Sequence, residues 1–365
     1  MQRIVIKVGT STLTVGTPHL NRQRMLELVQ QIALLQQQGY EMILVSSGAQ
    51  AAGRERLGFP DLGKSMSSKQ MLSAVGQGRL VHLYSEFFTI FEIVVAQVLL
   101  TRDDLSHRTR YLNARDTMQT LIEQRIVPVI NENDTVVVDE IRVGDNDNLS
   151  AMVASALEAD LLIMLTDQPG LFTADPRHNQ DAELIPTIER IDDSTYELAG
   201  GVGSTLGTGG MATKIEAAHT ASRSGVSTVI AQGSESNVIT RIVNGEQIGT
   251  RFEPVNSHLE SRKRWLLTDR IQGVIYIDAG AVSVLQRGGA SLLPVGVATI
   301  EGEFKRGATL VVKSPDGKDI AHGLSNYSSD ELKQLCGKKS SQIPEILGYS
   351  YGDYAIHRNN MVLLA

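Results

Sequence analysis

Two lysines and two groups of acidic and amide residues are the side chains best suited to chemistry. Lys7 lies inside an apolar run, and Lys214 follows a glycine-rich stretch. Residues 131–134 read Asn-Glu-Asn-Asp, and residues 144–148 read Gly-Asp-Asn-Asp-Asn. Lysine ammoniums stabilise phosphates, while acids and amides hold polar substrates. Either polar group alone is typical of a turn or a helix cap, but two groups flanking one hairpin-like run favour an active site.

Lys7 is expected near the carboxyl end of a strand over residues 3–8. A buried parallel strand is apolar throughout, so a lysine in it needs a charged partner. The small residues Gly9 to Thr12 follow, which would let a phosphate approach the backbone. The alternative is an edge-strand lysine whose ammonium reaches solvent. We favour the phosphate interpretation.

The stretch Gly207 to Lys214, read Gly-Thr-Gly-Gly-Met-Ala-Thr-Lys, is the most specific nucleotide-binding motif. Its glycines let the backbone reach phosphate oxygens, and Lys214 adds positive charge near the start of a helix expected over 215–223. The motif is neither a Walker loop nor a dinucleotide fingerprint. A flexible glycine linker is the alternative, which the helix-forming Met-Ala-Thr-Lys continuation argues against.

Strands and helices alternate along the first two thirds of the chain. Apolar strands are expected over 3–8, 42–45, 93–99, 126–130 and 160–165, with helices over 25–35, 69–83, 112–124 and 149–157. This alternation predicts an α/β fold with a mainly parallel sheet, whose ligands bind at the carboxyl ends of the strands. Ser47 and Gly48 follow one such strand, and Thr166 and Asp167 follow another. Turn and cap chemistry is the alternative explanation at both places.

Length and charge indicate two domains of different character. A chain of 365 residues is long enough for two. Residues 1–261 have 21 basic and 31 acidic side chains, and residues 262–365 have 13 and 10, giving net charges of −10 and +3. The acidic first part is a poor candidate for nonspecific nucleic-acid binding.

Cysteine and histidine usage indicates a reducing compartment and no structural metal. Cys336 is the only cysteine, and the eight histidines lack zinc-site spacing, so no metal ligands are assigned. The sequence begins on an apolar strand instead of a charged-then-apolar leader, and Glu92 and Gln97 interrupt the apolar stretch 90–100. We therefore expect a soluble, cytoplasmic protein.

Six motifs together resemble the amino acid kinase family, and within it the branch that phosphorylates L-glutamate. They are Lys7-Val-Gly-Thr-Ser, Val45-Ser-Ser-Gly-Ala, Asn131-Glu-Asn-Asp, Gly144-Asp-Asn-Asp-Asn, Thr166-Asp and Gly207-Thr-Gly-Gly-Met-Ala-Thr-Lys. The later part resembles a PUA domain, through motifs such as Gly288-Gly-Ala-Ser-Leu-Leu-Pro-Val-Gly and Phe304-Lys-Arg-Gly. The resemblance implies an amino acid kinase domain over 1–260, with a mainly parallel central sheet between helices. It further implies a linker over 261–270, a small mainly-β PUA domain over 271–350 and a tail over 351–365.

The resemblance also implies a reaction. ATP, with Mg2+, would phosphorylate the side-chain carboxylate of L-glutamate to L-glutamyl 5-phosphate, the first step of proline synthesis. Because that carboxylate has an unperturbed pKa of about 4.3, no general base is required, and catalysis should be positioning plus cationic stabilisation. Proline as feedback inhibitor and a homo-oligomer, dimer or tetramer, are implied as well. Transfer of the product to glutamyl phosphate reductase and RNA binding by the PUA domain stay open.

Residue roles follow from the same resemblance. Lys7 and Lys214 would neutralise the transferring phosphoryl group, and either Asp145 or Asp147 would orient a lysine or the substrate. The glutamate-binding positions are matched by Ser47, Asp134 and Asn146. The carboxylate at position 134 would pair with the substrate ammonium. The ATP-binding positions are matched by Lys7, Thr166, Asp167, Thr208, Gly209, Gly210, Met211, Ala212, Thr213 and Lys214.

Two other functions are open alternatives. The first is a kinase of the same fold for carbamate, acetylglutamate or aspartate; the PUA-like domain and the paired acidic motifs argue for the glutamate branch instead. The second is an RNA-binding regulator with a relic kinase domain. The presence of both lysines and both acidic groups argues against a relic.

Overall fold

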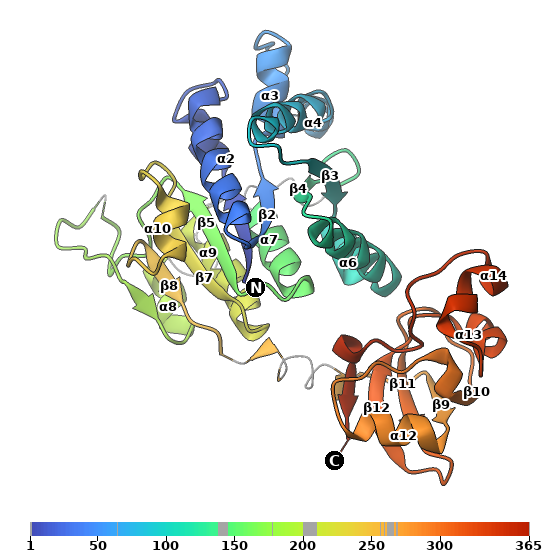
Figure 1. The fold of residues 1–365 in the computed structure, drawn as a ribbon. Coiled ribbons are helices and arrows are strands. Elements are labelled where there is room, and N and C mark those ends of the chain that lie inside the picture. The colour runs from blue at the N-terminus through green and yellow to red at the C-terminus, as the bar shows by residue number, and fades with distance from the viewer. Residues whose placement is uncertain are drawn as a thin grey trace. The chain divides into compact units, whose positions relative to one another are not determined.

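The computed structural model describes residues 2–63, 65–137, 145–176, 178–199, 210–255, 257, 258, 260, 266, 267 and 269–364. Contacts between residues divide the chain into two compact units, Met1–His258 and Leu259–Ala365. Each unit has its own sheet and its own hydrophobic core (Figure 1).

A mainly parallel sheet of eight strands forms the centre of the first unit, as the alternation of elements predicts. Its order is β3-β4-β2-β1-β5-β7-β8-β6. The parallel strands are β1 (Arg3–Val8), β2 (Glu41–Ser46), β3 (Val95–Leu100), β4 (Val127–Glu132), β5 (Leu161–Thr166) and β7 (Ser227–Gln232). At the far edge, β8 (Thr250–Phe252) is antiparallel to β7 and parallel to β6 (Thr187–Ile188).

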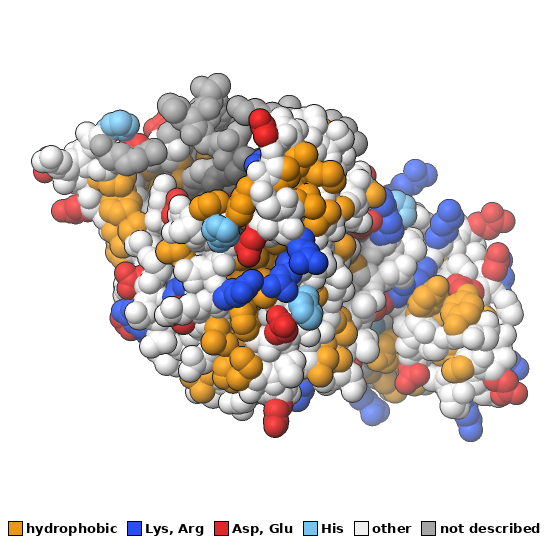
Figure 2. Space-filling model, turned by 90° about the horizontal axis from the view of Figure 1, so that it is seen from above, with side chains coloured by type: hydrophobic (Ala, Val, Ile, Leu, Met, Phe, Trp, Pro, Cys, Tyr) orange, Lys and Arg blue, Asp and Glu red, His pale blue; other side chains and the backbone are white. Residues whose placement is uncertain are grey.

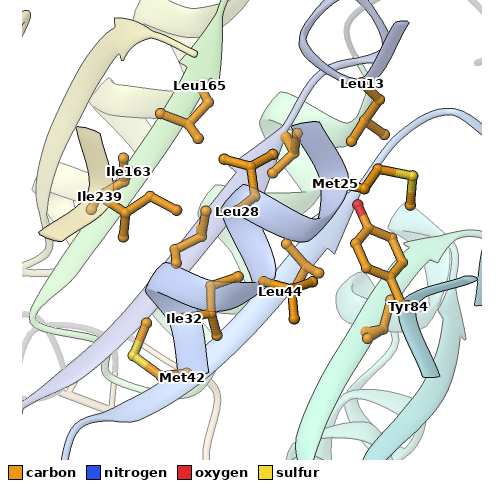
Figure 3. Packing of buried hydrophobic residues seen from close by; sticks show 14 of the residues in the cluster. Leu13, Met25, Leu28, Ile32, Met42, Leu44, Tyr84, Ile163, Leu165 and Ile239 are labelled. Atoms are coloured by element: carbon orange, nitrogen blue, oxygen red, sulfur yellow. The ribbon is translucent and has the colours of Figure 1, made fainter. Parts of the chain in front are cut away.

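Helices cover both faces of this sheet (Figure 1). On one face, buried side chains of the strands pack against α2 (Arg22–Gln37), α4 (Met66–Thr89) and α10 (Val238–Val243). On the other face they pack against α6 (Arg108–Glu123), α7 (Asp145–Ala156) and α9 (Met211–Arg223). Figure 3 shows Leu28 and Ile32 of α2 lying over Leu44 and Ile163 of the sheet. The shorter helices are α1 (Thr10–Thr14), α3 (Ala49–Arg56), α5 (Arg102–Ser106) and α8 (Asp193–Leu198).

The alternation of side chains along β1 decides which face receives Lys7. Successive side chains of a strand point to opposite faces. Ile4, Ile6 and Val8 belong to the core on the α2 and α4 face, whereas Val5 belongs to the core on the α7 and α9 face. Lys7 therefore points toward α7 and α9.

Strand β4 is longer than the sequence predicts. The expected strand ends at Ile130, but pairing with β3 continues through Asn131 and Glu132, which face Leu99 and Leu100. Both polar residues are buried, with 2% and 6% of their surface exposed. The first acidic group is therefore partly inside the sheet, and only its later residues form the turn. Most of the hairpin-like run after it lies outside the described residues.

Helices α3 and α4 approach each other so closely that only glycine fits at their contact. A Cβ atom at Gly53 would lie 2.0 Å from the Leu72 carbonyl oxygen, and one at Gly76 would lie 1.7 Å from the Ala49 carbonyl oxygen. Both distances are far inside van der Waals contact, so any side chain there would push the helices apart. These glycines fix α4 beside the end of β2.

The second unit has a five-stranded sheet in the order β10-β9-β11-β12-β13. Its strands are β9 (Gly273–Ile277), β10 (Val297–Glu301), β11 (Thr309–Lys313), β12 (Asp319–Leu324) and β13 (Met361–Leu363). All described pairings are antiparallel except that of β9 with β11. The helices are α12 (Ala279–Gln286), α13 (Ser329–Leu335) and α14 (Ile343–Leu347). Strand β13 belongs to residues 351–365, which the sequence analysis sets apart as a tail.

Candidate active site

Asp147 joins the two lysines that the sequence singles out. Its Oδ1 lies 2.5 Å from the Lys7 Nζ, and its Oδ2 lies 3.0 Å from the Lys214 Nζ. The side chain of Asp147 is 1% exposed, and each lysine side chain is 7% exposed. Of the two aspartates that the sequence left as alternatives, Asp147 is the one that contacts both lysines. The side chain of Asp145 lies outside the described residues.

The cluster of Lys7, Asp147 and Lys214 is buried, which makes its charges interact strongly. Burial lowers the pKa of Lys7; the nearby Asp147 carboxylate raises it again in part, and Lys214 lowers it further. Burial alone would raise the pKa of Asp147, but the two ammoniums more than offset this and hold it below its usual value. Asp147 is therefore ionised, and its single carboxylate contacts both ammoniums. Two ammoniums held this close together suit an anionic phosphoryl group.

The first turn of α9 positions Lys214 against α7. The helix begins at Met211, so Lys214 lies in its first turn, as the helix-forming Met-Ala-Thr-Lys continuation predicts. The hydroxyl of Thr213 is 3.1 Å from Asp147 Oδ2 and 2.9 Å from the Gly210 carbonyl oxygen. Two successive residues of α9 thus contact one carboxylate. Ala212 lies in the same turn, whereas Thr208 and Gly209 lie outside the described residues.

A second polar group, made mostly of amides, lies beside this cluster. The Asn146 Nδ2 donates to the Ser47 Oγ at 2.9 Å and to the Asn131 Oδ1 at 3.0 Å. The Asn131 Nδ2 in turn donates to the Gln77 Oε1 of α4 at 2.6 Å. The structure therefore brings the predicted residues Ser47 and Asn146 together. The roles of Asn131 and Gln77 were not predicted; Asn131 begins a recognised motif, whereas Gln77 lies in mid-helix where no pattern marks it.

Asp134 lies on the turn that follows β4. Partial burial raises the pKa of its carboxyl above the usual value, while the adjacent Ser73 hydroxyl lowers it. Within the described part of the chain, no lysine, arginine or histidine pairs with this carboxylate. A carboxylate in this setting favours a cationic ligand group.

Three chain segments meet at the carboxyl ends of β1, β5 and β7. The Gly233 N–H donates to the Thr166 carbonyl oxygen at 2.7 Å, and the Thr166 hydroxyl donates to Asp167 at 3.0 Å. A Cβ atom at Gly233 would lie 2.4 Å from the Thr12 Cγ2, so the segment after β7 needs glycine to approach helix α1. Asp167 is close enough to Lys7 to raise its pKa. The predicted ATP-binding pair therefore lies next to the lysine cluster, while the part played by Gly233 was not foreseen.

Neither a group of metal ligands nor a membrane-spanning helix occurs among the described residues. No three His, Cys, Asp or Glu side chains come together as metal ligands there. No helix in that part of the chain is both long and apolar enough to cross a lipid bilayer.

Comparisons with known proteins cover nearly the whole chain. Residues 2–232 match the amino acid kinase family, and residues 273–347 match the PUA domain. The glutamate 5-kinase of Herpetosiphon aurantiacus is 54% identical over 361 residues, which are 99% of this chain and 98% of that protein. Those of Deinococcus radiodurans and Yersinia pestis are 50% and 51% identical over 362 residues, covering 99% of this chain and 100% and 99% of the relatives.

Proposed function

This chain belongs to the amino acid kinase family, and we propose that it transfers the terminal phosphoryl group of ATP to the side-chain carboxylate of L-glutamate. The product is L-glutamyl 5-phosphate, with which proline synthesis begins. Relatives named glutamate 5-kinase, at 50% identity or more over nearly their full length, support this reaction. The observation that carries the proposal is the buried pair of lysines held by Asp147.

The side chains account for a transfer between two anions. The attacking carboxylate is already ionised near neutrality, so the barrier is repulsion between it and the phosphoryl group. Lys7 and Lys214 supply positive charge from a strand and a helix, in a buried setting where charge is weakly screened. We assign Asp147 the role of keeping both ammoniums in place before substrates bind. It touches the lysines and is a positioning residue.

Magnesium belongs to the nucleotide in this proposal. Phosphate oxygens are ligands that this ion prefers, and it commonly enters kinases bound to them. Asp167, at the exposed end of β5, is the carboxylate we assign to the vicinity of such an ion, because it already lies within electrostatic reach of Lys7. When bound, the ion would add to the positive charge around the phosphates.

Release of ADP by the purified protein tests the reaction. Magnesium-ATP is supplied with L-glutamate, L-aspartate, acetylglutamate or carbamate in separate assays. We expect release that depends on L-glutamate and is at least about 100-fold slower with the other acids, because a buried polar site discriminates strongly against ligands that leave its groups unpaired. If ADP release were faster with another of these acids, that acid and not L-glutamate would be the substrate.

Regulation and partners complete the proposal. Proline added to the same assay should suppress ADP release, and sedimentation should show a dimer or tetramer. We place the reaction in the cytoplasm, where ATP and glutamate are both available. Because an acyl phosphate hydrolyses readily, glutamyl phosphate reductase is the partner expected to consume the product. RNA binding by the PUA domain stays a prediction, taken up in the Discussion.

A further inference from the structure

One backbone N–H group sets the orientation of three amide side chains in succession. The Glu132 N–H can only donate, and it donates to the Asn131 Oδ1 at 2.9 Å. The other end of the Asn131 amide is therefore its donor, so the atom of Gln77 that it contacts must be the acceptor, Oε1. By the same logic, the atom of Asn146 that reaches the Asn131 Oδ1 must be the donor, Nδ2.

This fixed orientation leaves one donor and one acceptor without a partner. The Gln77 Nε2 and the Asn146 Oδ1 are buried and bonded to no atom in the described part of the chain. The Ser73 Oγ, one turn before Gln77 on α4, is also buried; it makes no hydrogen bond of ordinary geometry in the described part of the chain, although it lies close enough to Asp134 to lower the pKa of that carboxyl. Side chains four residues apart share one helix face. Gln77 and Ser73 are 8% and 3% exposed, so neither is satisfied by bulk solvent.

Buried polar atoms without partners are unfavourable and rare, so several of them around one network point to a ligand. The substrate of the proposed reaction has a positive and a negative group on its α-carbon. The acceptor Asn146 Oδ1 and the Asp134 carboxylate suit the ammonium. The donor Gln77 Nε2, together with the Ser73 hydroxyl, suits the carboxylate.

We propose that Gln77, assisted by Ser73, binds the α-carboxylate of the acceptor amino acid and thereby selects α-amino acids over simpler acids. Asn146 and Asp134 bind the α-ammonium. The inference rests on the proposed function and adds α4 to the substrate site. The close glycine contact at Gly76 keeps this helix at the required position, beside α3 and the end of β2.

The substitution Gln77→Glu separates the two roles that this side chain can have. A glutamate keeps a carboxylate oxygen to accept from the Asn131 Nδ2, but it replaces the free donor with a second oxygen, which repels the substrate carboxylate. We expect the KM for L-glutamate to rise by roughly 100-fold, with the KM for ATP within about twofold of the wild type. If Gln77 only holds Asn131, the KM for L-glutamate will not change, and the inference is wrong.

A substrate that lacks the α-carboxylate provides a second readout. 4-Aminobutanoate keeps the reacting carboxylate and the ammonium of L-glutamate. The wild-type protein should prefer L-glutamate strongly in kcat/KM, and Gln77→Glu should reduce that preference by roughly 100-fold because only L-glutamate loses a contact. An undiminished preference would contradict the assignment.

Two further variants keep the test decisive. Ser73→Ala removes one hydroxyl from a helix that tolerates alanine, and we expect the KM for L-glutamate to rise by about 5- to 20-fold. This variant decides the matter if Gln77→Glu does not fold, since an unchanged KM for L-glutamate in Ser73→Ala would then overturn the inference.

Gln70→Glu is the matched control: it puts the same charge on the same helix, but the Gln70 amide is already bonded to the Val137 carbonyl oxygen. We expect its KM for L-glutamate to stay within about threefold of the wild type.

Failure of the inference and failure of the proposed function look different in these assays. A wild-type protein that releases no ADP with L-glutamate overturns the function and the inference together. An active wild type with an unaffected Gln77→Glu variant overturns the inference alone.

Discussion

The active site of the first unit and a cluster of aromatic residues in the second unit both gather polar side chains, but they pair them differently. The aromatic cluster consists of Arg306, Tyr327, Glu331, Tyr349 and Tyr351. The Arg306 guanidinium lies 4.0 Å from the centre of the Tyr351 ring, and its Nε donates to a backbone carbonyl. The Tyr327 hydroxyl donates to another carbonyl at 2.6 Å, and Glu331 accepts from the Tyr349 hydroxyl. The polar groups of Arg306, Tyr327, Glu331 and Tyr349 are thus bonded to one another or to backbone.

The active site leaves comparable groups unpaired. Buried polar atoms of Thr12, Gln77 and Asn146 have no partner in the described part of the first unit. Each such atom costs stability, whereas a bonded cluster adds to it. The first unit therefore gives up stability to keep groups available for ligands, whereas the aromatic cluster stabilises the fold of its own unit.

Removal of a cluster lysine is the largest expected effect. Lys214→Ala should lower kcat by roughly 1,000-fold with a much smaller change in the KM for L-glutamate, because the ammonium acts on charge in the transition state. Steady-state ADP release measures both constants. Lys313→Ala is the control, since Lys313 pairs at the surface of the second unit with Asp319 and should leave kcat unchanged. Near-normal turnover in Lys214→Ala would mean that this lysine does not act in phosphoryl transfer, and the first unit would then not differ from the aromatic cluster in this respect.

The pH dependence of the reaction tests the electrostatics of the same cluster. Burial lowers the pKa of Lys7 below 10.5 in the folded protein. As pH rises, Lys7 therefore loses its proton earlier than an ordinary lysine, and kcat/KM for ATP should fall on an alkaline limb below pH 10.5. Asp147 raises this pKa, so Asp147→Asn should move the limb to lower pH. A limb that stays in place in Asp147→Asn would show that Lys7 does not set it.

Stability should also depend on Asp147. Its pKa is lower in the folded chain than the usual 3.8, so the stabilisation is present above pH 3.8 and is lost as pH falls through the folded-state pKa. Asp147→Asn leaves two buried ammoniums without their carboxylate and should lower the free energy of unfolding by about 3 kcal/mol near neutral pH. Urea unfolding followed by circular dichroism measures it. Equal stability of variant and wild type would mean that the three charges do not interact as their distances suggest.

The aromatic cluster should respond in the opposite way. Tyr351→Leu removes the ring that Arg306 covers while keeping an apolar side chain, and should lower the free energy of unfolding by about 1 kcal/mol. The kcat and KM values of ADP release should stay within about twofold of the wild type, because this ring belongs to the second unit, where it contacts the rings of Tyr327 and Tyr349. A kinetic defect without a loss of stability would contradict the assignment of this cluster to the fold.

The sequence predicts the first five strands of the first unit, because each is a short apolar run followed by polar or small residues. It does not predict β6, β7 and β8. It identifies Lys7 and Lys214 through motifs, but it does not decide between Asp145 and Asp147, since both belong to one run of acids and amides. The decision comes from the face of α7 that meets β1 and α9. Helical phase relative to other elements is a tertiary property that spacing in one segment does not contain.

Gln77 is a second residue whose role the sequence does not predict. It occupies an ordinary position in a helix predicted from its periodicity, among residues that pack on β4 and α3. Its importance arises from a hydrogen bond to a residue 54 positions away and from an orientation that the Glu132 N–H imposes. No local pattern contains either fact. The role of the glycines that hold α4 in place was not predicted either, because a glycine inside a helical pattern usually indicates only a less stable helix.

The smallest effect we expect is that of RNA on the second unit. Tyr349 and Tyr351 are 45% and 41% exposed and form a contact between rings, an arrangement able to stack on bases. The hydrogen bond to Glu331 raises the pKa of Tyr349 to about 12. Acidic and basic side chains are interspersed on the face seen in Figure 2. We therefore expect binding no tighter than about 10⁻⁵ M at physiological salt, as for nonspecific contacts.

Titration of a labelled single-stranded RNA at two salt concentrations checks this expectation. Weak binding that falls steeply with salt and does not change in Tyr349→Ala would fit a surface of low charge without a base-stacking site. Tight binding that Tyr349→Ala abolishes would mean that the second unit, like the first, keeps groups available for a ligand. The two units would then differ in the kind of ligand, a small acid in one and a nucleobase in the other. They would also differ in what the empty site costs: an exposed ring without a bound base loses little stability, whereas a buried donor without a bound carboxylate is destabilising.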